Sequence, residues 1–359
     1  MSNIEWTDAT WNPTVGCAKV ADGCKHCYAE NMSKRLAAMG QTAYAEILDD
    51  QGRFNGKAIT RPNTLDKPLR WRKPRTVFVN SMSDLFHKDV PFEFIDKVYA
   101  VMLACAVLNN RPHTFQILTK RPERMLEYFN HRMPRDHVKA WAEAGDGLVE
   151  LDNKDILFSE MVRGHTSLPW DEKGEALFGE TPHPWTHLKT TFPLPNVWHG
   201  VSVAEQKDAD KFILPMLNTP SAIHFVSYEP AVGPVDFRNI RLPGTGSEKG
   251  KEAILDALGG WLHTENDTWP QGAKIDWLII GGESGPGARP FDVAWARAAL
   301  KQCAAVDFLK TERTPVFVKQ LGAYPEDAGT SYRVTGKGGH INEIPEDLRV
   351  REFPERTSP

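Results

Sequence analysis

Three of the five cysteines lie within eleven residues near the start of the chain, where they could bind metal together. Cys24 and Cys27 form a C-x-x-C pair, and six residues separate Cys17 from Cys24. Thiolates are soft ligands that suit iron–sulfur clusters and zinc. A closed structural zinc site usually takes four ligands from two separated pairs, and no second C-x-x-C or Cys/His pair follows. Three thiolates without a fourth indicate a cluster with one coordination position left open for catalysis.

The other histidine and cysteine residues leave one alternative open. His26 could be the fourth ligand of a zinc site, but its position between Cys24 and Cys27 predicts a side chain that points away from the metal. Zinc therefore remains the alternative to an iron–sulfur cluster. Cys105 and Cys303 each lie in an apolar, helix-like segment, and we expect both to be small buried core residues.

The cysteines must be positioned by a framework of alternating strands and helices. A strand is expected within residues 5–14, and six later runs rich in β-branched or aromatic residues predict buried parallel strands. These runs are 76–86, 114–121, 197–205, 222–230, 276–284 and 315–322. Amphipathic helices are expected over 30–39, 92–108, 122–129, 205–217 and 291–304. About seven strand–helix units predict an α/β protein with a partial (β/α) barrel rather than a doubly wound sheet.

The ends of the predicted strands carry polar residues. They read Ser-Met-Ser-Asp, Thr-Lys-Arg, Ser-Val-Ala-Glu, Ser-Tyr-Glu-Pro, Gly-Gly-Glu-Ser and Lys-Gln. In a barrel these ends meet at one mouth, which is where active sites lie. We expect the barrel to span residues 1–324, with the cysteine loop at 16–28. Two segments, about 131–195 and 244–272, read as insertions, the first as a subdomain or lid, and 325–359 as a polar C-terminal extension.

Composition limits the class of protein. With 41% hydrophobic and 25% charged residues, the chain can bury an ordinary globular core. The sequence has no run of eighteen apolar residues and no signal pattern at its start, so we expect a soluble, cytoplasmic protein that does not enter membranes. A net charge of −4 argues against a protein that coats nucleic acid by bulk electrostatics, although a local basic patch is compatible with it.

One local basic segment is present at residues 67–75, where five cations surround one tryptophan. Cations bind phosphates and an indole can stack on a base. The segment therefore predicts either a nucleic-acid contact or a solvated basic face at the start of a strand. The residues that would make the contact are Arg70, Trp71, Arg72 and Lys73.

The cysteine run resembles the signature of the radical S-adenosylmethionine superfamily, in which three residues rather than six usually separate the first two cysteines. The segments IEWTDATWNPTVGC, GCKHCYAENM, VNSMSDLFH, LTKRPERM, GVSV and IIGGESGPGARP resemble a phage-associated three-cysteine family related to spore photoproduct lyase. This resemblance covers residues 4–322. It implies a TIM-barrel-like partial (β/α) barrel of the radical SAM type, with a 4Fe–4S cluster on Cys17, Cys24 and Cys27.

The resemblance also implies a binding site for S-adenosylmethionine. His26 and Tyr28 would lie on the adenine, although Tyr28 could instead belong to the core. The other expected cofactor-binding residues are Ser81, Ser83 and Asp84 at the amino group, Lys120 at the carboxylate, Ser202 near the ribose, and Glu229 and Glu283 at later strand ends. The lyase has a hydrogen-donating cysteine where this chain has Ser81, and a serine O–H bond is too strong for that role.

The function that the resemblance implies is reductive cleavage of S-adenosylmethionine to a 5′-deoxyadenosyl radical. That radical would abstract hydrogen from a DNA photolesion, in lyase-type repair. A nucleotide or RNA substrate is the alternative within the same chemistry. The alternative of another class is a non-catalytic, zinc-containing nucleic-acid-binding phage protein. Arg121, near the mouth, is a further expected substrate contact, and flavodoxin or ferredoxin would be the external reductant.

Overall fold

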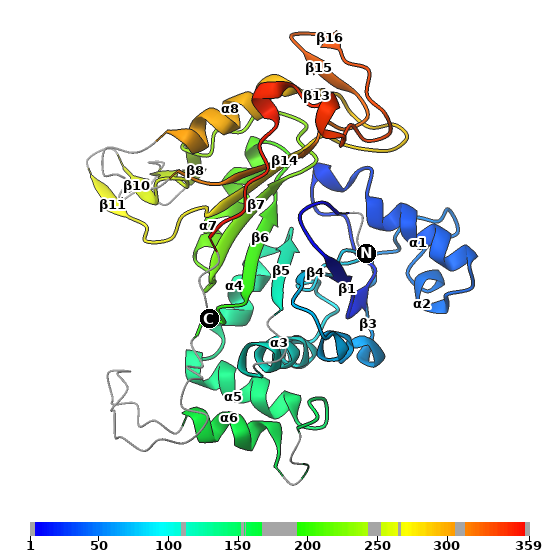
Figure 1. Cartoon of the computed structure of the whole chain (residues 1–359), viewed down its shortest axis with the longest axis vertical. Helices are drawn as coiled ribbons and strands as arrows, with labels where there is room; N and C mark the ends of the chain where they lie inside the picture. The colour runs from blue at the N-terminus through cyan, green and yellow to red at the C-terminus, as the bar shows by residue number, and fades with distance from the viewer. Residues whose placement is uncertain are drawn as a thin grey trace.

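The protein is built around a sheet of seven parallel strands in chain order (Figure 1). The computed structural model describes residues 4–108, 113–151, 154, 156–166, 192–242, 253–264, 267–305 and 313–355. The strands are β1 (Ala9–Trp11), β4 (Thr76–Val79), β5 (Thr114–Thr119), β6 (Val197–Ser202), β7 (Ile223–Tyr228), β12 (Trp277–Gly281) and β14 (Val316–Gln320). Within the described residues β1 and β14 do not pair with each other, so the sheet is an open half-barrel. All seven predicted strands are confirmed.

Five helices occupy the predicted positions between the strands. They are α1 (Tyr28–Ala38), α3 (Phe92–Val107), α4 (Pro122–Asn130), α7 (Gln206–Leu217) and α8 (Val293–Ala304). α4 begins with Pro122, whose missing N–H would have no partner in the first turn. The Asp292 side chain caps α8 by accepting a hydrogen bond of 2.8 Å from the Ala294 N–H. No helix in the described part of the chain combines the length and the apolar character that a membrane span requires.

Strand alternation sends side chains to two separate apolar cores. Residues on the outer face, including Val79, Ile117 and Val201, pack beneath the helices in the larger core. The inner face is filled by aromatic side chains near the amino ends of the strands, and we call this group the aromatic floor. Its members are Trp6, Trp198, Phe225, Trp277 and Phe317. The floor therefore fills the amino-end part of the inner face with apolar side chains, and polar side chains follow toward the carboxyl ends.

Several elements lie outside this framework. A short strand pair, β2 (Thr14–Val15) with β3 (Ile59–Thr60), and α2 (Thr42–Ala45) flank the cysteine loop. The described part of the predicted insertion at 244–272 belongs to an antiparallel sheet of β8 (Ile240–Leu242), β9 (Ala253–Asp256), β10 (Trp261–His263) and β11 (Thr268–Pro270), and residues 244–252 and 265–266 lie outside the described residues. A further small sheet is formed by β13 (Phe291–Asp292), β15 (Pro325–Asp327) and β16 (Thr330–Ser331). Short 3₁₀ helices span Asp22–Cys24, Pro62–Thr64, Lys67–Arg70, Ile341–Glu343 and Glu346–Leu348.

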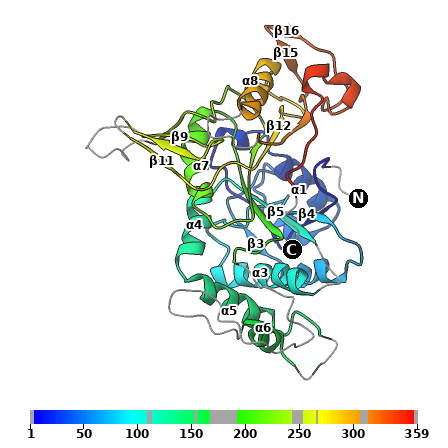
Figure 2. The same cartoon turned by 60° about the vertical axis from the view of Figure 1, so that its left-hand side comes forward.

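The insertion expected at 131–195 contributes two helices, α5 (Pro134–Gly145) and α6 (Phe158–Thr166). α5 packs on α3, and α6 packs on α5. In both views these helices lie at the lower end of the molecule, away from α1 (Figures 1 and 2). Residues 152–153, 155 and 167–191 of this insertion lie outside the described residues. Its described part extends the helical layer and does not cover the carboxyl ends of the strands.

The segment 325–355, expected to be a polar extension, packs against the half-barrel. Ile344 and Leu348 are buried. The Val318 N–H donates to the Val350 carbonyl at 2.8 Å, and the Glu352 N–H donates to the Val316 carbonyl at 2.9 Å. These bonds cover the outer edge of β14. The periodicity of the sequence is weak here because only a few side chains are buried, while main-chain bonds hold the rest.

Candidate functional site

The cysteine loop lies across the carboxyl ends of the strands of the seven-stranded sheet. We call this end of the sheet the mouth. Gly16 enters the loop with φ of 87°, and a Cβ there would lie 2.4 Å from the Lys57 carbonyl oxygen, so only glycine fits. A Cβ on Gly23 would lie 3.3–3.6 Å from Ala204, Lys120 and Pro230. Those three residues follow β6, β5 and β7. The loop therefore lies directly on the mouth.

The three thiols of the loop are partly buried, unbridged and close enough to affect one another. Burial raises the pKa of Cys17 to about 11, and Asp84 raises it further, against the lowering effect of Arg121. Burial also raises the pKa of Cys27, and the charge of Cys24 raises both of these pKa values. Without metal, Cys17 and Cys27 are therefore protonated at neutral pH, and a bound metal must displace their protons.

The residues present fit a multinuclear cluster by their donor chemistry. Within the described ranges, no three His, Cys, Asp or Glu side chains converge closely enough to hold a single metal ion. In an iron–sulfur cluster each thiolate binds a different iron, so its ligands lie farther apart. The same end of the sheet has unused polar groups: Asn80 Nδ2 and His87 Nε2 are buried without a hydrogen-bond partner in the described structure. Three soft ligands and spare polar atoms suit a large polar group.

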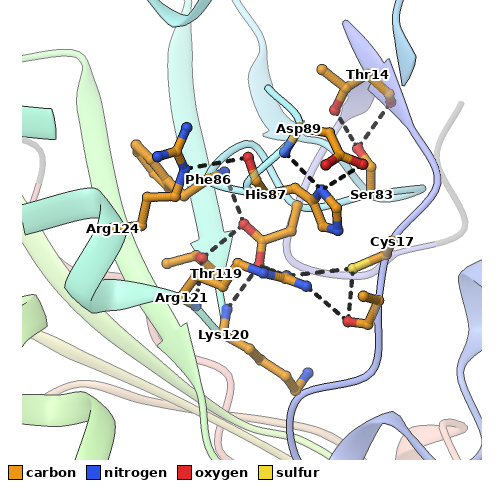
Figure 3. A network of polar contacts seen from close by, with 12 residues as sticks. Thr14, Cys17, Ser83, Phe86, His87, Asp89, Thr119, Lys120, Arg121 and Arg124 are labelled. Atoms are coloured by element: carbon orange, nitrogen blue, oxygen red, sulfur yellow. Dashed lines mark hydrogen bonds and ion pairs between the residues drawn. The ribbon is translucent and has the colours of Figure 1, made fainter. Parts of the chain in front are cut away.

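Asp84 and Arg121 form a largely buried network beside the first cysteine. Figure 3 shows the Arg121 side chain reaching toward Cys17. Asp84 is 5% exposed and accepts hydrogen bonds from Arg121 Nη1 (2.8 Å), Thr119 Oγ1 (2.8 Å) and two backbone N–H groups, those of Phe86 (3.0 Å) and Lys120 (3.1 Å). Arg121 also donates to Cys17 Sγ at 3.5 Å and to the Ala18 carbonyl at 2.8 Å. Asp84 therefore holds Arg121 against the cysteine loop.

The two serines after β4 tie that strand to the segment before the cysteines. The Ser81 hydroxyl donates to Asn12 Oδ1 at 3.2 Å. The Ser83 hydroxyl donates to the Thr14 carbonyl at 2.9 Å and lies 2.6 Å from the Thr14 hydroxyl. Both serines therefore lie at the mouth, with their hydroxyls in contact with the chain that leads to Cys17.

Lys120 and Glu229 face the mouth from the ends of β5 and β7, the two strands that flank β6. The Lys120 ammonium has no hydrogen-bond or ion-pair partner within the described residues, and its charge lowers the pKa of Cys27. Glu229 lies 2.6 Å from the Lys319 ammonium, and its backbone carbonyl accepts from the Ser202 hydroxyl at 3.0 Å. Lys319 was expected only as part of the Lys-Gln strand end and not as a site residue. Strand alternation could have found it, because Phe317 points inward two residues earlier.

The loop after β12 clamps the other side of the cysteine loop. Glu283 accepts hydrogen bonds from Arg289 at 2.7, 2.8 and 2.9 Å. Burial raises the pKa of Glu283, but these bonds and the charge of His26 hold it below its usual value. Arg289 also donates to the Asp22 carbonyl at 3.1 Å. Tyr28 is 61% exposed, so it is not a core residue.

The basic segment lies at the opposite end of the sheet, because it leads into the amino end of β4. Trp71 packs edge-on against His113 with ring centroids 5.6 Å apart, and Arg75 lies 5.2 Å above the Trp71 ring. A groove of about 720 Å³ runs beside it, lined by Asp66, Leu69, Arg70, Trp71, Arg72, Leu148 and Glu150. The structure thus separates two sets of expected substrate contacts, Arg121 at the mouth and Arg70–Lys73 at the far end.

The remaining cysteines lie in the core, as predicted. Cys105 in α3 is 1% exposed and Cys303 in α8 is 2% exposed. Burial raises the pKa of Cys303 to about 12. These two thiols are therefore separate from the site at the mouth and can serve as internal controls for it.

Comparison with known proteins gives one match. A family described as "Protein of unknown function (DUF5131)" matches residues 1–348. No curated protein and no solved structure matches the chain.

Proposed function

Since the chain belongs to the DUF5131 family of proteins of unknown function, we propose a function from its site: the protein is a radical S-adenosylmethionine enzyme, and the half-barrel is of the radical SAM type. One observation carries the proposal. Three thiols lie on one loop across the mouth of a parallel half-barrel, Cys24 is within electrostatic reach of both Cys17 and Cys27, and the sequence places no fourth cysteine beside them. Cys17, Cys24 and Cys27 would hold a 4Fe–4S cluster with one iron free.

A cluster held by Cys17, Cys24 and Cys27 would supply the one-electron reduction needed to cleave S-adenosylmethionine and so to start hydrogen abstraction from the substrate. The protein binds, orients and excludes water. Lys120 offers a free ammonium for the cofactor carboxylate, and Ser202 and Glu229 lie on the neighbouring strands that face it. The aromatic floor closes the opposite end of the inner face.

The substrate class is a nucleobase lesion in DNA, in lyase-type repair. The described mouth pairs most of its charges, Arg121 with Asp84, Arg289 with Glu283 and Lys319 with Glu229, and it leaves Lys120 for the cofactor carboxylate. This balance suits an uncharged base inside the mouth, with the phosphates outside. A free nucleotide or an RNA base has the same chemistry and is the second candidate. The electron would come from an external reductant such as flavodoxin or ferredoxin.

The test is anaerobic reconstitution followed by metal analysis. We expect about four iron atoms per wild-type chain, as for one 4Fe–4S cluster, and little iron in Cys24→Ala. Cys105→Ala is the matched control, because it removes a buried cysteine away from the loop, and it should keep the iron of the wild type. Tightly bound zinc in place of iron would overturn the proposal and favour the zinc-containing nucleic-acid-binding protein.

A second experiment separates the substrate classes. Release of 5′-deoxyadenosine after addition of dithionite and S-adenosylmethionine is the expected sign of the radical chemistry. Dinucleotide photolesions, free nucleotides and RNA oligomers are then compared as substrates. Turnover of nucleotides or RNA without turnover of any photolesion would replace DNA repair by the second candidate.

A further inference from the structure

Arg121 is placed as a fixed part of the cysteine loop rather than as a mobile surface cation. Its side chain is only 13% exposed. Nη1 contacts both Asp84 Oδ2 at 2.8 Å and Cys17 Sγ at 3.5 Å, and Nη2 donates to the Ala18 carbonyl at 2.8 Å. A planar guanidinium held by acceptors from three places has one orientation. Its contact with Cys17 therefore exists before any ligand arrives.

The carboxylate that holds Arg121 is itself immobile. Asp84 accepts three further hydrogen bonds, from the Thr119 hydroxyl and from two backbone N–H groups. Two backbone N–H groups donate to this carboxylate. If the carboxylate turned toward another partner, those N–H groups would lose their hydrogen bonds. Asp84 thus fixes the direction in which the guanidinium presents its charge. That direction is toward the sulfur of the first cysteine.

We propose that Arg121 is a positioning residue that tunes the reduction potential of the cluster through its hydrogen bond to Cys17. The inference rests on the proposed function. Reduction adds negative charge to the cluster and its thiolates. A nearby guanidinium that donates to a ligand sulfur stabilises the reduced form more than the oxidised form. Arg121 therefore makes the cluster easier to reduce, and it contacts neither the substrate nor the reacting atoms.

The experiment is a redox titration of reconstituted protein, followed by visible absorbance, with iron analysis of every sample. Arg121→Gln should lower the equilibrium constant for one-electron reduction at least tenfold, which is a midpoint about 59 mV more negative. Arg121→Lys keeps the positive charge but loses the planar guanidinium with its several N–H donors. Its midpoint should therefore lie between those of Arg121→Gln and the wild type. Arg238→Gln is the control: Arg238 also pairs with an aspartate at 2.8 Å, Asp256, and its side chain is 23% exposed, so the midpoint of this variant should match the wild type.

The outcomes separate the inference from the proposed function. Wild-type protein that takes up no iron overturns both. Wild type with a cluster, and Arg121→Gln with the same midpoint and full iron, overturn the inference alone. Should Arg121→Gln fail to load, Arg121→Lys decides: a midpoint below the wild type supports the inference, and one at or above it contradicts the inference.

Discussion

The two ends of the inner face differ although the same strands build both. On β6, Trp198 belongs to the aromatic floor and Ser202, four residues later on the same face, lies at the mouth. On β7 the same step leads from Phe225 to Glu229, and on β14 two residues lead from Phe317 to Lys319. Each strand therefore divides its inward residues between packing and chemistry. The comparison indicates that stability and ligand binding can be changed separately.

The largest expected effect comes from the floor. Trp277→Ala removes a fully buried ring that packs edge-on against Trp6 and Trp198, with centroids 6.2 and 6.0 Å away. We expect the free energy of unfolding to fall by about 4 kcal/mol, measured by urea denaturation. Folded Trp277→Ala should still bind the wild-type amount of iron. Equal stability of Trp277→Ala and the wild type would contradict the role assigned to the floor.

A substitution at the mouth should instead change stability and iron binding together. Asp84→Asn leaves the buried guanidinium of Arg121 without its carboxylate, which should cost about 3 kcal/mol of unfolding free energy. Iron content should fall as well, because the cysteine loop loses its support. The double variant Asp84→Asn/Arg121→Gln has no uncompensated charge and should regain part of the stability. No recovery in the double variant would show that the lost pairing is not the cause.

Lowering the pH should destabilise the protein on the outer face of the sheet, beneath the helices. Burial lowers the pKa of His199, which contacts the Tyr99 hydroxyl at 2.6 Å, from 6.5 to about 3. The unfolded chain therefore binds the proton more readily, and stability is full above pH 6.5 and is lost as the pH falls toward 3. Between pH 7 and pH 5, protonation of this histidine in the unfolded chain should lower the free energy of unfolding by about 2 kcal/mol. Urea denaturation of His199→Gln should show a pH dependence smaller by that amount.

The smallest effect should come from the basic segment at the amino end. Arg72 and Lys73 are exposed, so the double change Arg72→Glu/Lys73→Glu should alter the unfolding free energy by less than about 0.5 kcal/mol. Iron content and release of 5′-deoxyadenosine should match the wild type. Loss of iron in this variant would mean that the basic segment at the amino end of the sheet affects the cysteine loop at the carboxyl end, and would contradict their independence.

The framework was accessible from the sequence because its signals are local. Seven apolar runs and five amphipathic segments predicted the strands and helices, and the apolar surroundings of Cys105 and Cys303 predicted their burial. The ends of the predicted strands also pointed to the mouth. These features depend on residues close together in the chain, where periodicity carries the information.

The contacts between side chains from distant segments could not be predicted from the sequence in the same way. Arg121 was expected to meet the substrate, and its contacts with Asp84 and Cys17 depend on three segments brought together by the fold. Trp6 precedes β1 and gives no periodic signal, yet it packs against Trp277 of a late strand. The helices α5 and α6 lie in a segment rich in Trp, Pro, Gly and His, a composition that concealed their short amphipathic patterns.

The bonds from residues 350–352 to β14 have a practical consequence for handling the protein. An outer strand with unpaired backbone groups invites other chains to add to it, and native proteins cover or interrupt such edges. A chain truncated before Val350 would expose β14 in this way. We expect that truncation to produce concentration-dependent oligomers in light-scattering measurements, while the full chain stays free of them under the same conditions.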